Sequence, residues 1–134
     1  MISKHISFLE ATQSPTALRL GIDNKPNEAQ LAAMKIVAEK CFEPLREFWC
    51  QPIKINSFFR SEELNRAVKG SVTSQHCKGE AIDLSGANKE ENKNIFQWCK
   101  DNLIYDQLIN EYDFSWVHIS FKVGHNRNQI LIIK

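Results

Sequence analysis

The sequence predicts an α+β fold, with helices packed on one face of a mostly antiparallel sheet. Apolar residues recur with helical spacing in the early and middle parts of the chain, within residues 27–48 and 89–102. Residues 105–111, 116–122 and 129–133 are rich in strand-forming side chains, follow one another at the end of the chain, and are expected to be linked by hairpins. Separate runs of helices and strands are typical of α+β domains.

The early helix has a clear start and one interruption. Asn27 is a good N-cap residue, and Gln30 lies three positions later, where a capping box requires it. The apolar residues that follow are three or four positions apart and define one helical face: Leu31, Met34, Val37, Cys41, Leu45 and Phe48. Pro44 has no backbone N–H and clashes with the preceding turn, so we expect the helix to bend or break there.

Shorter elements surround this helix. Residues 1–26 are expected to form an arm packed on the domain, with a short helix near residues 14–20. Residues 52–59 alternate at first and predict a strand. Ser61 is then expected to cap a short helix over residues 62–69.

Length and composition indicate one soluble globular domain, residues 1–134, since 43% of the residues are hydrophobic and 25% are charged. A net charge of +1 offers no attraction to nucleic acid or to an anionic membrane surface, so neither is expected as a partner. The sequence shows no signal-peptide pattern and no membrane-spanning run. We therefore expect cytoplasmic synthesis, and the lack of an obvious apolar interface stripe favours a monomer.

The four cysteines are Cys41, Cys50, Cys77 and Cys99. None of them forms a Cys-x-x-Cys pair, which makes a cysteine-rich zinc site improbable. Cys41 and Cys99 fall on apolar helical faces and are expected to be buried free thiols.

Two segments supply candidate metal ligands. Every second residue of the late strand at 116–121 is apolar and is expected to face the core: Val117, Ile119 and Phe121. The residues between them are expected to face a cleft: Trp116, His118 and Ser120. The same alternation directs Ile82 and Leu84 to the core and Asp83 to the opposite face. A carboxylate within so apolar a strand is costly unless it is paired, hydrogen-bonded or bound to a metal.

His76, Asp83 and His118 are therefore predicted to converge on one ion. Three protein ligands and one open position describe a catalytic zinc site. Gly79 allows the backbone to turn between His76 and the strand that carries Asp83. Cys77 adjoins a proposed ligand and is expected to point away, with ligation of a soft metal as the alternative.

The same residues carry a family resemblance. Residues 74–83 have the pattern Ser-x-His-x-x-Gly-x-Ala-x-Asp, and residues 116–118 have the pattern Trp-x-His. Together they resemble the zinc-dependent D-Ala-D-Ala carboxypeptidase family of peptidoglycan peptidases, the M15 family, and most closely its short phage-type branch. The resemblance extends to residues 44–46, 57–65 and 107–111, and so spans nearly the whole chain.

This resemblance implies a Hedgehog-like α+β fold with one Zn²⁺ held by His76, Asp83 and His118. The implied activity is hydrolysis of a peptide bond in the bacterial stem peptide or cross-link, as a carboxypeptidase or an endopeptidase. Many relatives are phage endolysins, which are made without a signal and released to the cell wall through a separate pore protein. The resemblance leaves the bond undetermined: D-Ala-D-Ala, L-Ala-D-Glu or a cross-bridge.

A hydrolytic mechanism also needs a general base. Some branches of the family place it three residues before the last ligand, where this chain has Ser115, which cannot serve. Glu111, on the preceding strand, is the best candidate, and the phage-type branch is similar there. Asp113 is the second choice, although its position favours a role in the turn.

Three further residues are predicted to contact the substrate. Arg60 could bind a substrate carboxylate or stabilise the developing oxyanion, and its alternative is a surface ion pair with Glu62 or Glu63. Ser74 could bind substrate or orient a ligand. Trp116 could form the floor of the cleft.

Two other classes of function remain open. Because Ser115 stands where a base is found in some relatives, the domain could bind zinc and the wall, or a protein, without catalysing hydrolysis. Alternatively, the chain could be a metal-independent structural protein, such as a virion component. Bound zinc without hydrolysis would indicate the binding module. Purified protein without zinc would indicate the metal-independent structural protein.

Overall fold

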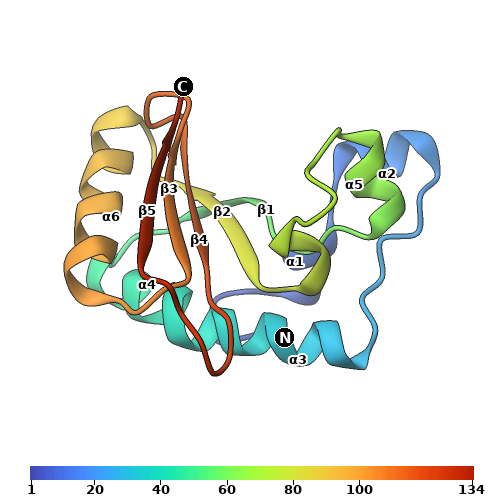
Figure 1. The fold of residues 1–134 in the computed structure, drawn as a ribbon, viewed down its shortest axis with the longest axis horizontal. Helices are drawn as coiled ribbons and strands as arrows, with labels where there is room; N and C mark the ends of the chain where they lie inside the picture. Colours follow the sequence, from blue (N-terminus) through green and yellow to red (C-terminus); the bar gives the residue numbers. More distant parts are fainter.

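A computed structural model describes all residues 1–134 and contains one five-stranded sheet with the strand order β1-β2-β4-β3-β5 (Figure 1). The strands are β1 (Lys54–Ser57), β2 (Ala81–Ser85), β3 (Gln107–Glu111), β4 (Trp116–Ser120) and β5 (Gln129–Ile133). All neighbouring strands are antiparallel except β3 and β5, which are parallel. The predicted mostly antiparallel sheet is confirmed.

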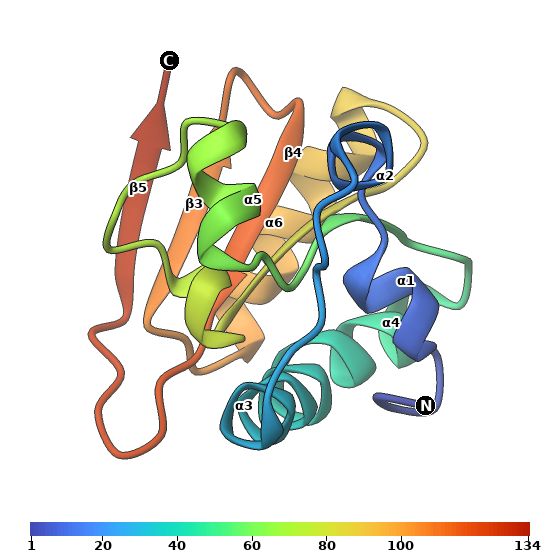
Figure 2. The same cartoon turned by 90° about the vertical axis from the view of Figure 1, so that its right-hand side faces the viewer.

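Eight helical segments accompany the sheet. They are α1 (Phe8–Thr12), α2 (Pro15–Leu20), α3 (Glu28–Val37), the π-helical η1 (Ala38–Phe42), α4 (Glu43–Trp49), α5 (Glu62–Ala67), the 3₁₀ turn η2 (Gln75–Lys78) and α6 (Lys89–Asn102). The long helix α6 packs along one face of the sheet, while the short α2 and α5 stand across the other face (Figures 1 and 2). The predicted α+β class is confirmed, and the open space between α5 and the sheet is where the cleft described below lies.

The long early helix is interrupted where its proline requires it. Asn27 and Gln30 form the predicted capping box at the start of α3. Before Pro44 the helix widens into η1, and the N–H of Glu43 bonds the carbonyl of Ala38, five residues earlier. Pro44 follows this π-helical turn at the start of α4, and the helical backbone continues through it to Trp49.

The last strand pairs differently from the expected hairpin. Strand β4 has β2 on one side and β3 on the other, so neither of its edges is available. After the turn at residues 124–128 the chain therefore passes β4 and adds β5 to the free edge of β3, in parallel. The resulting edge strand is more exposed than the rest of the sheet.

The core lies between α6, α3, α4 and the inner face of the sheet. Its fully buried members include Met34, Val37, Leu45, Ile82, Leu84, Ile95, Leu108, Val117 and Ile119. Each such side chain contributes roughly 1.5–3 kcal/mol relative to an exposed position. The predicted alternation of β2 and β4 is confirmed, because the apolar residues of both strands belong to this core.

All four cysteines are free thiols. Burial raises the pKa of Cys41 to about 12 and also raises that of Cys99. Both side chains are therefore neutral and pack as small apolar groups, as predicted.

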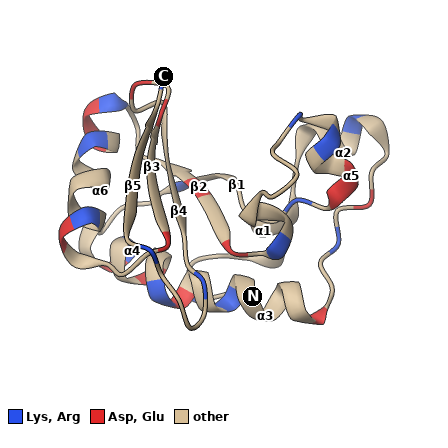
Figure 3. Ribbon diagram, in the orientation of Figure 1, with Lys and Arg blue, Asp and Glu red and all other residues tan.

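Residues of both charges occur on the long helices. Lysines lie among acidic residues along α6, and α3 carries Glu28 near its start and Lys35 near its end (Figure 3). None of the helices combines the length and the apolar composition that crossing a bilayer requires.

The N-terminal arm is fixed by both apolar and polar contacts. Ile2 and Ile6 are buried, and His5 Nδ1 lies 2.6 Å from a carboxylate oxygen of Glu43. Asn24 donates to the carbonyls of Thr12 and Phe59 at 2.7 and 3.0 Å. These contacts hold the arm against the segment that follows β1.

An ion pair between the buried Asp106 and the exposed Arg127 fixes the loop before β5. The carboxylate of Asp106 accepts hydrogen bonds from the Arg127 backbone N–H, Nε and Nη2 at 3.0, 2.9 and 2.7 Å. Asp106 is 1% exposed. Hydrogen bonds from Arg127 lower the pKa of Asp106 to about 2.

We predict that Gly79→Ala destabilises the fold by about 3 kcal/mol or more. Gly79 has a φ of +74°, and an added Cβ would lie 2.5 Å from the carbonyl oxygen of Gln30. Gly21→Ala is the matched control, because Gly21 has a φ of +67° but no atom within 4 Å of an added Cβ. Backbone strain alone should cost the control about 1–2 kcal/mol in urea unfolding. Equal losses of unfolding free energy in the two variants would contradict a clash between the added Cβ at position 79 and Gln30.

We also predict that Asp106→Asn lowers the free energy of unfolding at neutral pH by about 2 kcal/mol. Because the folded-state pKa lies below the unfolded value of about 4, the stabilisation is present above pH 4 and is lost as the pH falls to about 2. Urea unfolding at several pH values should show a shallower acid dependence in the variant. Asp113→Asn, which removes an exposed ion pair with Lys89, should change stability by less than about 1 kcal/mol.

Candidate metal centre

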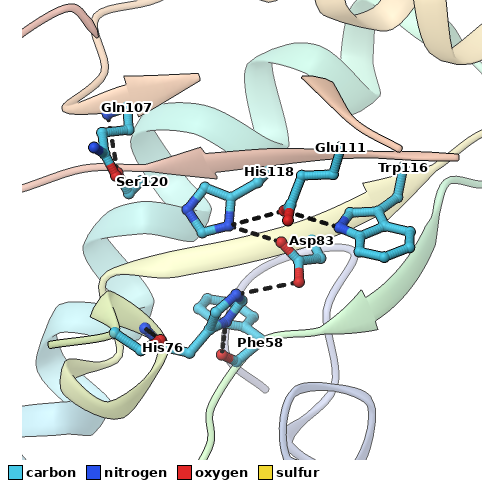
Figure 4. Close-up of polar contacts among 9 residues, drawn as sticks. Phe58, His76, Asp83, Gln107, Glu111, Trp116, His118 and Ser120 are labelled. Atoms are coloured by element: carbon cyan, nitrogen blue, oxygen red, sulfur yellow. Dashed lines mark hydrogen bonds and ion pairs between the residues drawn. The ribbon is translucent and has the colours of Figure 1, made fainter. Parts of the chain in front are cut away.

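Strand register brings two of the three predicted ligands together. Asp83 on β2 is directly opposite His118 on β4. Their side chains lie on the sheet face away from α6, because Ile82, Leu84 and Val117 occupy the other face. Asp83 Oδ1 lies 2.8 Å from His118 Nδ1 (Figure 4).

The third predicted ligand reaches the same point from the turn η2. Ser74 caps this turn, with its Oγ accepting the backbone N–H of His76 at 3.2 Å. Gly79 ends the turn in the left-handed conformation and directs the chain into β2. His76 Nε2 lies 3.2 Å from Asp83 Oδ2.

A backbone carbonyl sets the tautomer of His76. Nδ1 lies 2.7 Å from the carbonyl oxygen of Phe58, which can only accept a hydrogen bond. In the neutral ring the proton is therefore on Nδ1, and Nε2, which faces Asp83 and His118, carries the lone pair (Figure 4). A metal-binding histidine is commonly oriented in this way, by a partner on its other nitrogen.

The three side chains fit a metal ion. One ligand atom from each residue lies within 4.8 Å of the other two, close enough to share one ion. His76 is 1% exposed, and its Nε2 has no hydrogen-bond partner in the protein. An orphaned imidazole nitrogen beside a carboxylate and a second imidazole is the donor set that zinc prefers. Cys77 is not part of this group.

The negative charge of Asp83 also suits the binding of a metal ion. Burial opposes ionisation of this carboxyl, but the adjacent His76 and His118 outweigh it and hold the pKa of Asp83 below its ordinary value. The carboxylate is therefore ionised at neutral pH.

Glu111 stands beside the ligands on β3. Its Oε2 accepts a hydrogen bond from Trp116 Nε1 at 3.0 Å and lies 3.7 Å from His118 Nδ1. Burial, followed by the negative charge of Asp83, raises the pKa of Glu111. Trp116, predicted as a floor of the cleft, does line it and also fixes the position of this carboxylate.

The alternative base lies elsewhere. Asp113 is in the turn after β3, has a φ of +54° and pairs with Lys89 at 3.2 Å on the surface. Ser115 Oγ donates to the carbonyl of Tyr112. Neither residue lines the cleft, so Glu111 is the carboxylate available next to the three predicted ligands.

The three predicted ligands lie in a cleft of about 780 Å³ between the sheet and the elements across from it. Trp116, His118, Ile109 and Glu111 contribute from the strands. Residues 13–16 of the arm also line it, and no sequence pattern indicated that role. Ser120, expected to face the cleft, is instead fully buried, and its Oγ accepts the N–H of Gln107.

Arg60 lines the same cleft. Its backbone N–H donates to the carbonyl of His76 at 3.2 Å, so it is tied to the ligand-bearing turn. Its side-chain Nε is buried without a partner, and the alternative ion pairs with Glu62 and Glu63 do not form. Ser74 also lines the cleft.

This fold and this site define a class of protein. Two imidazoles and one carboxylate meet at one point in a cleft, and a second carboxylate, that of Glu111, lies beside them. This is the arrangement of a mononuclear zinc hydrolase. Residues 4–120 match a family model described as Peptidase M15. The chain therefore belongs to this family, whose members are zinc-dependent peptidases. A search of curated proteins found no match.

Proposed function

We propose that the protein hydrolyses a peptide bond in the stem peptide or cross-link of bacterial peptidoglycan, with one zinc ion held by His76, Asp83 and His118. The observation that carries the proposal is the buried Nε2 of His76, which makes no hydrogen bond in the protein and lies 3.2 Å from Asp83 Oδ2, in one group with His118. Membership of the M15 family supports the reaction class. As in endolysins, the cell wall would be the place of action.

When bound, zinc supplies Lewis acidity toward water and toward the scissile carbonyl. Glu111 is suited to accept the proton of the attacking water, because its pKa is raised and Trp116 fixes its orientation. As the C–O bond forms and the C–N bond breaks, Glu111 returns that proton to the leaving amine. The net reaction adds one water across one peptide bond.

Arg60 and Ser74 have separate roles in this proposal. Arg60 lines the cleft and its guanidinium forms no ion pair, so it can bind a substrate carboxylate or stabilise the developing oxyanion. Ser74 supports the turn that carries His76, and its place in the cleft also allows contact with substrate.

We predict that Glu111→Gln retains zinc and loses hydrolysis by about 10²-fold or more, because glutamine cannot accept the proton. Zinc content is measured by mass spectrometry of the metal, and turnover by release of peptides from purified peptidoglycan. Asp113→Asn is the matched control and should keep both properties. Loss of turnover in Asp113→Asn, with full activity in Glu111→Gln, would assign the base to Asp113. Zinc without turnover in the wild type would favour a binding module.

We predict that His76→Ala, Asp83→Ala and His118→Ala each lower bound zinc well below one ion per chain. Removing one of three ligands leaves two, which is too few for a stable site. His125→Ala should retain the ion, because His125 lies in the loop before β5. A chelator should also lower the melting temperature of the wild type, since the ion stabilises only the folded chain. Wild-type protein without zinc would overturn the proposal and favour a structural role.

A further inference from the structure

A second groove lies beside the metal cleft, between the N-terminal arm and the outer side of β1. Its volume is about 980 Å³. The arm supplies side chains from α1 and α2 and the segment at residues 22–25, and β1 supplies Lys54, Ile55 and Asn56. Nothing in the hydrolytic mechanism uses this groove.

The two depressions adjoin each other. Gln13, Ser14, Pro15 and Asn56 line both the cleft and the second groove. These residues form a wall common to both, so a chain that leaves the cleft over this wall enters the groove. This shared wall distinguishes the groove from an isolated surface hollow.

The chemistry of the groove suits an extended peptide with a negative charge. Phe8, Leu9 and Leu18 are exposed and gather on its arm side, and a cluster of exposed apolar side chains is typical of a binding surface. Lys25 and Lys54 are exposed and form no ion pair, and Asp23 is the acidic residue in the lining. The groove thus offers apolar contacts and a net positive charge.

The edge of β1 adds unused backbone groups. Strand β1 pairs only with β2, on one side. No backbone hydrogen bond outside that ladder involves residues 54–57. Free N–H and C=O groups along a strand edge are the groups that an extended peptide uses when it binds to a sheet.

From these observations we infer that the groove is a second binding region for substrate. It takes an extended acidic segment of the wall peptide, distant from the bond that is cut, and Lys25 and Lys54 attract its carboxylates. The inference rests on the proposed function, because it assumes that the wall peptide is cut in the metal cleft and states where the rest of that peptide lies. It predicts that affinity rises with peptide length and with the presence of a glutamate carboxylate.

Calorimetric titration of two peptides tests this inference. The zinc-loaded protein carries Glu111→Gln to prevent turnover, and the probes are an N-acylated D-Ala-D-Ala dipeptide and a stem pentapeptide that contains glutamate. We expect the pentapeptide to bind at least about tenfold more tightly. The double variant Lys25→Glu/Lys54→Glu should lose most of this difference and leave dipeptide affinity unchanged. Lys40→Glu/Lys100→Glu, with the same change in net charge, should retain it.

A second pair of variants tests the apolar contacts. Leu18→Ser removes an exposed side chain from the groove, whereas Leu20→Ser changes an exposed leucine of the same helix that lies outside it. Only Leu18→Ser should weaken pentapeptide binding. The inference would be overturned if protein with the unchanged groove bound both peptides equally well. It would also be overturned if the pentapeptide still bound more tightly in both Lys25→Glu/Lys54→Glu and Leu18→Ser. Failure of the proposed function gives a different result: zinc-loaded wild-type protein that hydrolyses neither peptide nor wall.

Discussion

The structure depends on the register between β2 and β4, which sets Asp83 directly opposite His118. On one side of these strands, Ile82, Leu84 and Val117 are packed into the core. A shift of one residue in either strand would turn a core residue toward the cleft and a ligand into the core. Packing of the apolar face into the core therefore sets the register of the two strands. That register determines where the predicted metal ligands lie on the opposite face.

Polar groups that do not stabilise the fold lie around this pair. The Nε2 atom of His76 is buried without a partner, and so is the Nε atom of Arg60. A buried unsatisfied group costs about 1–3 kcal/mol. The capped turn at residues 74–79 and the Phe58 carbonyl hold His76 in orientation, and Trp116 does the same for Glu111. Such unfavourable local arrangements are expected where a ligand completes the structure.

Much of this could be predicted from the sequence, where local rules decide the outcome. Alternation along residues 81–84 and 116–119 was sufficient to place Asp83 and His118 on one face, and Asn27 and Pro44 marked the start and the break of the early helix. The parallel pairing of β5 was missed because it depends on which strand edge remains free. The Phe58 carbonyl and the cleft wall at residues 13–16 were missed because backbone groups and long-range packing leave no residue pattern. Membership of the M15 family could be predicted because its motifs include His76, Asp83 and His118, the predicted ligands.

X-ray absorption at the zinc edge of the zinc-loaded protein tests the central claim most directly. We predict that the ion is bound by nitrogen and oxygen only, at about 2.0–2.2 Å, from His76, Asp83, His118 and one exchangeable ligand. A sulfur scatterer at about 2.3 Å would show that Cys77 or another cysteine holds the ion. That result would contradict the site described here.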